Sequence, residues 1–160
     1  MNIREIQPKD NYAIEQIIKR SLESFQLNLP GTAYFDPQLS NLAEYYQQHD
    51  KAKYWVAVND HDEVLGGAGI GPFGQNPDVC ELQKLYLTPA AQGQGIAKQL
   101  MQTTLSFAAE HYTSCYLETF KALEAANNLY LKFGFRQLEE PFADTEHGAC
   151  DAWYVKDLTE

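Results

Sequence analysis

The spacing of hydrophobic and polar residues along the chain predicts strands and helices in alternation. Runs of β-forming residues predict strands at 2–6, 54–58, 63–70, 79–87, 115–117, 135–138 and 153–158. Apolar residues at helical spacing predict helices from Pro8 to the Leu29-Pro30-Gly31 break and at 37–49, 95–110 and 121–133. Asp36 is a candidate N-cap of the second helix, and Gly134 a C-cap of the fourth.

The order of these elements, βαα-βββ-αβ-αβ-β, predicts an α/β fold with one central sheet and helices on both faces. The chain has 160 residues, a length typical of one domain, so we expect a single domain over 1–160. No repeat, low-complexity tract or interdomain linker interrupts the pattern.

Charge and cysteine content narrow the functional classes. The net charge of −10, from 12 basic and 22 acidic residues, argues against nucleic-acid binding, which depends on Lys and Arg contacts to phosphate. An acidic surface can steer cationic amines toward the protein, or simply keep it solvated. Three cysteines, no apolar leader and no apolar run of ~20 residues predict a cytoplasmic protein without membrane spans.

One stretch combines a strand, a turn of small residues and the start of a helix. The strand 79–87 leads through a turn with Gly93 into the helix that begins at about Gly95. Unpaired backbone N–H groups and the helix dipole make such an N-terminus a site for anions, pyrophosphate above all. Small residues let the backbone approach that phosphate closely.

This turn shares features with three known phosphate-binding motifs. A Walker A loop needs Gly-Lys-Ser/Thr, which is absent, and a dinucleotide fingerprint needs a small residue where Lys98 stands. The pattern Gln92-x-x-Gly95-x-Ala97, preceded by 85–89 (Leu-Tyr-Leu-Thr-Pro), resembles instead the acetyl-CoA signature of the GNAT superfamily, Arg/Gln-x-x-Gly-x-Gly/Ala.

A second motif lies at the distance that this family expects. The segment 129–135 (Leu-Tyr-Leu-Lys-Phe-Gly-Phe) resembles the family's Leu-Tyr-x-x-x-Gly-Phe, with Ala126 as its small residue one turn earlier. One position departs from the family: Leu123 stands where an Asn often binds the cofactor, and Asn127 and Asn128 lie on other faces of the helix.

The resemblance implies a mixed, largely antiparallel sheet and acetyl-CoA as co-substrate, with no metal. By the same resemblance, the cofactor contacts are expected at Leu85, Tyr86, Leu87, Gln92, Gly93, Gln94, Gly95, Ile96, Ala97 and Tyr130.

The implied chemistry is direct attack of a neutral amine on the acetyl thioester. The oxyanion would be stabilised by the backbone N–H of Leu87, with that of Tyr86 as the alternative, and Tyr130 holds the family's position for returning a proton to the thiolate. The amine needs a base, because an ammonium with a pKa of ~10.4 is a poor nucleophile.

Two residues are candidates for that base. Glu81 stands where glutamate-using members of the superfamily place theirs, and strand alternation puts it on one face with Gln83, Leu85 and Leu87 unless a bulge intervenes. His147 lies in a loop with Cys150 and Asp151 and needs little tuning to act near pH 7. These three side chains make a poor zinc pattern, so we expect no metal.

The acceptor side is predicted with less detail. Tyr34 and Phe35, between the first two helices, and Glu81 are candidate acceptor contacts. The expected reaction is acetylation of a primary amine of a small molecule or peptide. The open alternative is a catalytically silent acyl-CoA-binding sensor on the same fold, and a homodimer is possible for either.

Overall fold

The computed structural model describes residues 1–159. One sheet of seven strands, in the order β1-β2-β3-β4-β5-β7-β6, forms its centre. The strands are β1 (Asn2–Glu5), β2 (Lys53–Val58), β3 (Val64–Pro72), β4 (Val79–Leu87), β5 (Ser114–Thr119), β6 (Arg136–Leu138) and β7 (Ala152–Asp157). Only β4 and β5 pair in parallel, and the other neighbours are antiparallel. The mixed, largely antiparallel sheet is therefore confirmed.

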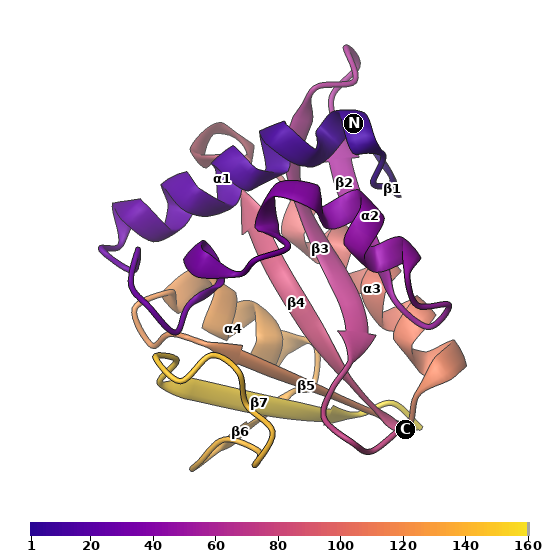
Figure 1. Cartoon of the computed structure of the whole chain (residues 1–160), viewed down its shortest axis with the longest axis vertical. Helices are drawn as coiled ribbons and strands as arrows, with labels where there is room; N and C mark the ends of the chain where they lie inside the picture. Colours follow the sequence, from indigo (N-terminus) through magenta and orange to yellow (C-terminus); the bar gives the residue numbers. More distant parts are fainter. Residues whose placement is uncertain (160) are drawn as a thin grey trace.

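Helices cover both faces of this sheet (Figure 1). They are α1 (Asn11–Ser24), α2 (Leu42–Gln47), α3 (Ile96–His111) and α4 (Glu124–Lys132). Single turns of 3-10 helix precede three of them: η1 (Pro8–Asp10) leads into α1, η3 (Leu39–Asn41) into α2, and η4 (Pro89–Ala91) lies before α3. A fourth turn, η2 (Ala33–Phe35), lies between α1 and η3.

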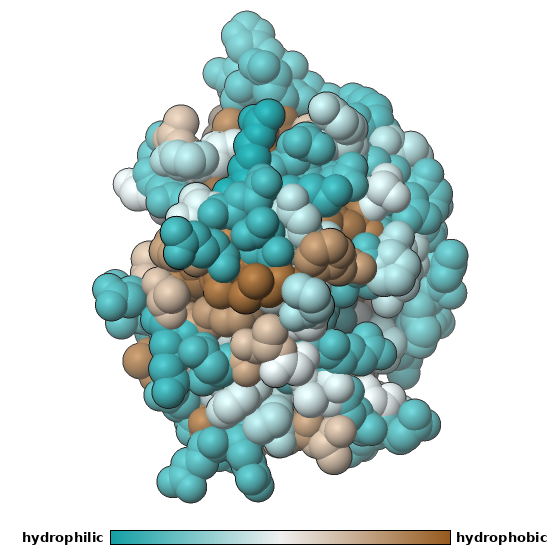
Figure 2. Space-filling model, turned by 60° about the vertical axis from the view of Figure 1, so that its left-hand side comes forward, coloured by the Kyte–Doolittle hydropathy of each residue, from teal (hydrophilic) through white to brown (hydrophobic). Residues whose placement is uncertain are grey.

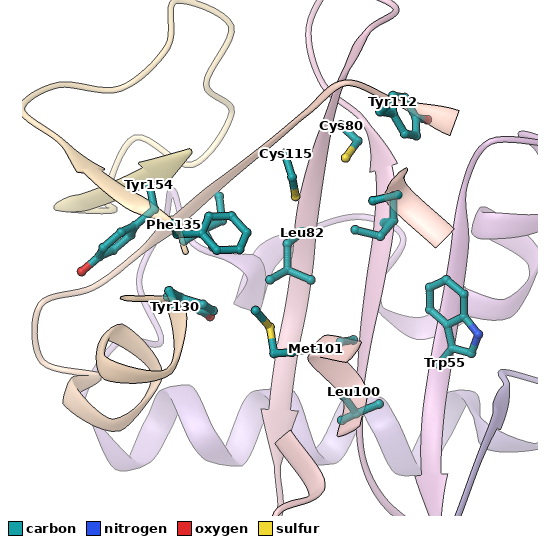
Figure 3. Packing of buried hydrophobic residues seen from close by; sticks show 14 of the residues in the cluster. Trp55, Cys80, Leu82, Leu100, Met101, Tyr112, Cys115, Tyr130, Phe135 and Tyr154 are labelled. Carbon is teal, nitrogen blue, oxygen red and sulfur yellow. The ribbon is translucent and has the colours of Figure 1, made fainter. Parts of the chain in front are cut away.

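Alternation along the central strands divides the buried residues into two cores. On β2, Tyr54, Val56 and Val58 pack with α1 and α2, whereas Trp55 and Ala57 pack with α3 on the opposite face. Figure 3 shows the core on the α3 face, in which Leu100 and Met101 of α3 lie against the sheet. Both faces of the sheet are thus sealed by helices.

Three of the expected helices are shorter in the structure. The first covers only Asn11–Ser24, because Pro8–Asp10 forms a turn of 3-10 helix and the α-helix ends well before Leu29. The second begins at Leu42 rather than residue 37, because Asn41 has φ −142° and the side chain of Asn11 accepts the backbone N–H of Ala43 at 2.9 Å. The fourth begins at Glu124 rather than residue 121, because Leu123 is non-helical with ψ 65°. The predicted role of Asp36 as a helix N-cap is wrong, since Asp36 only follows η2 and its carboxylate is used elsewhere.

Candidate active site

A cleft opens where the two parallel strands spread apart. β4 and β5 are paired only from Val79 to Glu81 and from Ser114 to Tyr116, although both strands continue further. Figure 1 shows them diverging toward α4. A cavity of about 400 Å³ occupies this opening, and its walls come from β4, β5, α4, the α1–α2 connection and the β6–β7 loop. On this side of the molecule, hydrophobic residues gather in the middle of the face, surrounded by hydrophilic ones (Figure 2).

A bulge in β4 decides which side chains enter the cavity. Lys84 has φ +53°, and the pairing of β3 with β4 shifts register between Gly67 and Gly69. The Tyr54 hydroxyl donates to the Lys84 carbonyl at 2.7 Å and holds the bulge in place. Positive φ is unusual for a residue with a side chain, so this conformation depends on its surroundings.

The bulge corrects the expected facing of Glu81. Leu82 and Leu85 both pack on the α3 face, together with Leu87, so Glu81 lies on the opposite face from Leu85 and Leu87. Glu81 instead shares its face with Gln83, which bonds to Tyr46 of α2. The expectation that Glu81 shares a face with Leu85 and Leu87 is therefore wrong, and the bulge is the reason.

Beyond the bulge, β4 offers a backbone donor to the cleft. The Thr88 N–H bonds to the Leu65 carbonyl of β3 at 2.8 Å. Because N–H groups alternate direction along an antiparallel strand, the Leu87 N–H points to the opposite edge, toward the cleft, and the Tyr86 N–H points back to β3. Of the two candidate oxyanion donors, the geometry favours Leu87.

The glycine turn before α3 has the shape that an anion site requires. Gly93 and Gly95 have φ of +77° and +79°, and a Cβ added to either would meet no atom within 4 Å. The open space lies at the N-terminus of a 16-residue helix, where free N–H groups and the helix dipole attract phosphate. Lys98 and Lys132 line the hollow beside this turn, two basic residues that the motif did not single out.

Some of the other residues of the turn line the cavity, and others make contacts within the protein. Gln92, Gly93 and Ala97 line the cavity. The Gln94 side chain donates to the Ala90 carbonyl at 2.8 Å, and Ile96 is buried in the core, so the Ile96 side chain is not available to a cofactor.

Tyr130 reaches the cavity from α4. Its ring is buried against Phe135 and Tyr154, with centroid separations of 6.0 and 5.7 Å (Figure 3). Within residues 1–159 its hydroxyl makes no hydrogen bond, and burial raises its pKa well above the ordinary value, so the group keeps its proton at neutral pH. Leu123 also lines the cavity, whereas Asn127 donates to the carbonyls of Leu123 and Phe120 and is occupied in the fold.

Glu81 is held in the cavity by a chain of hydrogen bonds. The Tyr46 hydroxyl donates to Gln83 Oε1 at 2.5 Å, and Gln83 Nε2 donates to Glu81 Oε1 at 2.8 Å. Burial raises the pKa of Glu81 to about 7, aided by the charge of Glu118 and opposed by the Gln83 hydrogen bond. A carboxylate with such a pKa can accept and release a proton near neutral pH.

A second cluster lies beside Glu81 and centres on Asp36. His147 Nε2 lies 3.0 Å from Asp36 Oδ1, and Lys84 Nζ lies 2.8 Å from Asp36 Oδ2. The Asp36 hydrogen bond raises the pKa of His147 above its ordinary value, which favours the imidazolium. Burial opposes ionisation of Asp36, but His147 and Lys84 outweigh it and lower the Asp36 pKa.

The loop between β6 and β7 lines the end of the cavity that holds Glu81 and Glu118. Tyr116 donates to Glu118 Oε2 at 2.9 Å, and the Thr145 hydroxyl donates to the same oxygen. The Phe142 N–H donates to the Tyr116 hydroxyl at 3.2 Å, and its ring stacks on that of Tyr116. His147 fixes the loop to Asp36, so β5 and the α1–α2 connection both anchor it.

The structure does not bring Tyr34 and Phe35 to the cavity. Tyr34 donates to Glu23 of α1 at 3.2 Å, and Phe35 is 57% exposed. The α1–α2 connection does reach the cavity, but through Ala33, Asp36 and Gln38. A role of Tyr34 and Phe35 in acceptor binding remains a prediction without a contact to support it.

Sequence reasoning missed Asp36, Lys84 and Glu118. A signal for the bulge was present, because Glu81, Gln83 and Lys84 are all polar and so break the two-residue alternation of the strand. Nothing local marked Asp36 or Glu118 as cavity residues, since these roles depend on the approach of distant segments.

The geometry suits an acyltransferase that draws its acyl group from a phosphate-bearing thioester. The glycine turn before α3, a backbone donor of β4 and a protonated Tyr lie along one cavity with a carboxylate whose pKa is about 7. Within the described part of the chain, no group of three or more His, Cys, Asp or Glu side chains is placed to hold a metal ion. No helix there has the length and apolar character needed to cross a bilayer.

Comparison with known proteins identifies the family. The model of the acetyltransferase (GNAT) family matches residues 13–135. The chain is 36% identical over 159 residues to an Escherichia coli protein named Uncharacterized N-acetyltransferase YjgM, and the alignment covers 98% of this chain and 94% of that protein. The chain therefore belongs to the acetyltransferase (GNAT) family and is an acyltransferase.

Solved structures show the same fold. A GNAT-family acetyltransferase from Staphylococcus aureus Mu50 matches with a TM-score of 0.84 at 20% identity, covering 98% of each chain. A phosphinothricin acetyltransferase from Sinorhizobium meliloti, solved with acetyl-CoA, matches with a TM-score of 0.74 at 20% identity, covering 98% of this chain and 87% of that one. The expected GNAT-like architecture is confirmed.

Proposed function

We propose that the protein transfers an acetyl group from acetyl-CoA to a primary amine of a small molecule or peptide, with Glu81 as the base. The observation that carries this proposal is the position of Glu81. It lies in the cavity that begins at the phosphate turn, and burial raises its pKa to about 7. A buried carboxylate with this pKa is suited to take a proton from an ammonium and pass it on to solvent.

The residues of the cofactor side fit acetyl-CoA. The open space over Gly93 and Gly95, with Lys98 and Lys132 nearby, suits a pyrophosphate and a further phosphate. The cleft between β4 and β5 leads from this turn to Glu81 and would hold the extended pantetheine arm. Leu123 can give that arm only apolar and backbone contact, so we expect the backbone of β4 to supply its hydrogen bonds.

Each catalytic role falls to a different element. Bound acetyl-CoA supplies an electrophilic thioester carbonyl. Glu81 on β4 would take a proton from the acceptor ammonium, directly or through one water, so that the neutral nitrogen can attack. The Leu87 N–H would stabilise the negative charge that develops on the carbonyl oxygen. Tyr130 on α4 would donate its hydroxyl proton to the leaving sulfur and recover one, directly or through water, from the acceptor nitrogen, which must lose its second proton to become the amide.

The surroundings of His147 argue against it as the base. Its Nε2 is bonded to Asp36, and that bond raises the His147 pKa and favours the protonated ring. With Nε2 bonded to Asp36, only Nδ1 could present a lone pair to the acceptor, and the raised pKa of His147 favours the imidazolium, in which Nδ1 also carries a proton. We therefore give His147 the role of holding the β6–β7 loop over the cavity.

The test is release of free CoA thiol from acetyl-CoA across a panel of primary amines, with mass spectrometry of the acceptor. We expect turnover that depends on the amine, and an acceptor product heavier by one acetyl group. Glu81→Gln should abolish most of this turnover and retain acetyl-CoA binding. A wild-type protein that binds acetyl-CoA but never acetylates an amine would instead be a sensor, and the proposal would be wrong.

A further inference from the structure

The cavity and the hollow beside the glycine turn differ in the charge of the residues that line them. The basic residues Lys98 and Lys132 lie beside the phosphate turn, in the outer hollow. In the inner cavity the basic residues are Lys84 and His147, and both are ion-paired with Asp36. Lys84 is only 5% exposed, so no cation of the described residues is free to meet a negatively charged acceptor there.

Acidic residues at the acceptor end, in contrast, have no cationic partner. Glu81, Glu118, Asp144 and Glu146 line the inner cavity, and none of them forms an ion pair within residues 1–159. Negative charges gathered in a low-dielectric hollow raise the local concentration of cations. The acceptor ammonium needs only one of them, which is Glu81 in the proposed mechanism.

Glu118 is the residue whose hydrogen bonding is incomplete. Its Oε2 accepts the hydroxyls of Tyr116 and Thr145, whereas its Oε1 is shielded from solvent and meets no donor among residues 1–159. A buried carboxylate oxygen without a donor costs free energy, and an ammonium carries three donors. Glu118 follows Tyr116 by two residues on β5, so the two side chains lie on the same face of the sheet. Tyr116 is paired in register with Glu81 of β4.

We propose that the acceptor carries a second positively charged group besides the amine that is acetylated, and that Glu118 binds this group. The class of acceptor is therefore a diamine, a polyamine or another polycationic amine, rather than an amino acid with a free carboxylate. This inference rests on the proposed function and adds to it the charge of the acceptor and the residue that recognises it.

The test compares three acceptors of equal chain length that differ at the far end. These are 1,4-diaminobutane, n-butylamine and 4-aminobutanoate, which place an ammonium, a methyl group and a carboxylate there. A charge-assisted hydrogen bond is worth ~1.5–3 kcal/mol, so we expect kcat/KM for the diamine to exceed that for butylamine by about 10- to 100-fold. The aminobutanoate should be the poorest acceptor. The assays are run at pH 8.5, where Glu81 is ionised in every variant.

Three variants distinguish binding of the second ammonium by Glu118 from effects on folding and from a change in the net charge of the protein. Glu118→Gln keeps an oxygen for Tyr116 and Thr145 but puts an amide NH₂ where a second ammonium would bind, so the diamine preference should fall to within about threefold of unity. Glu118→Asp keeps the charge and should retain a preference. Glu140→Gln makes the same charge change on an exposed residue outside the cavity and should leave the preference as in wild type.

Calorimetry with the CoA-loaded protein gives a second readout that does not require turnover. Selective binding of the diamine that Glu118→Gln removes, without acetylation of any amine, would support the recognition site and overturn the proposed function. Equal turnover of the diamine and butylamine would leave the acetyltransferase function standing and overturn this inference. A diamine preference that survives Glu118→Gln would also overturn it, because the second charge would then be bound elsewhere.

Discussion

Replacing Glu81 with Gln should stabilise the protein at high pH, although it removes the proposed base. The carboxylate is buried, and burial raises its pKa from 4.5 to about 7. Glutamine has nearly the same shape, and its oxygen can still accept the Gln83 hydrogen bond. The substitution therefore removes the charge and little else.

The direction of the pH dependence of stability follows from proton binding in the folded and unfolded states. Between pH 4.5 and about 7, folded Glu81 holds a proton that the unfolded chain has lost, so wild-type stability falls as pH rises. Above pH 7 the folded protein bears the full free-energy cost of an ionised, buried Glu81. A pKa difference of this size corresponds to about 3 kcal/mol. Each kcal/mol shifts the melting temperature of a domain of this length by ~2–4 °C.

The assay is thermal unfolding of wild type and Glu81→Gln between pH 5 and pH 9. We expect a Gln variant that melts several degrees above wild type at pH 8.5, and a difference that shrinks to about 2–3 °C at pH 5, where the unfolded carboxyl is already partly ionised. The exposed Glu140→Gln change serves as the charge control and should show no such trend. A difference that does not vary with pH, or a wild type that gains stability through pH 7, would refute the argument that Glu81 is ionised at a cost.

The remaining predictions concern the other walls of the cavity. Tyr130→Phe should lower kcat by ~10²–10⁴-fold while acetyl-CoA affinity holds, and a variant with full kcat would assign the proton to another group. Gly95→Glu should weaken acetyl-CoA binding, measured by calorimetry, by several kcal/mol, roughly what an unfavourable charge at a phosphate site costs. Gly95→Ala introduces the same positive-φ strain without the charge and should weaken binding less. Equal losses in the two variants would mean that strain alone is responsible. Asp36→Asn should lower the pKa of His147 measured by NMR titration, because the hydrogen bond that raises it is weakened, and an unchanged titration would contradict the assigned pairing.

The parts of the fold that local patterns control could be predicted from the sequence. Val79 to Leu87 alternates apolar residues over most of its length and is a strand at the expected bounds. Gly134 has φ +88° and follows the fourth helix, as a C-cap glycine should. The glycine turn before α3 also has the left-handed residues that its composition suggests.

Features that depend on tertiary contacts could not be predicted in this way. The bulge at Lys84 is held by the hydroxyl of Tyr54, thirty residues earlier in the chain. It reverses the facing of Glu81 relative to Leu85, which strict alternation cannot reveal. The shortened second helix likewise depends on Asn11, whose side chain bonds the Ala43 N–H from another element.

The acceptor side was the least predictable part of the site. Asp36 and His147 are 111 residues apart, and only the fold shows that their side chains meet. Tyr34 and Phe35 were singled out for their aromatic character, but their neighbour Asp36 is the residue that lines the cavity. Loop residues that come together across the sequence leave no periodic signal.

The central claim is that Glu81 is the base of an acetyl-CoA-dependent amine acetyltransferase, and a pH–rate profile tests it most directly. The measurement is kcat/KM for acetyl transfer, with the best acceptor of the amine panel, for wild type, Glu81→Gln and His147→Ala. We predict an acidic limb through about pH 7 in wild type and in His147→Ala, and a low, flat profile in Glu81→Gln. An acidic limb that survives in Glu81→Gln and disappears in His147→Ala would contradict the claim and make His147 the base.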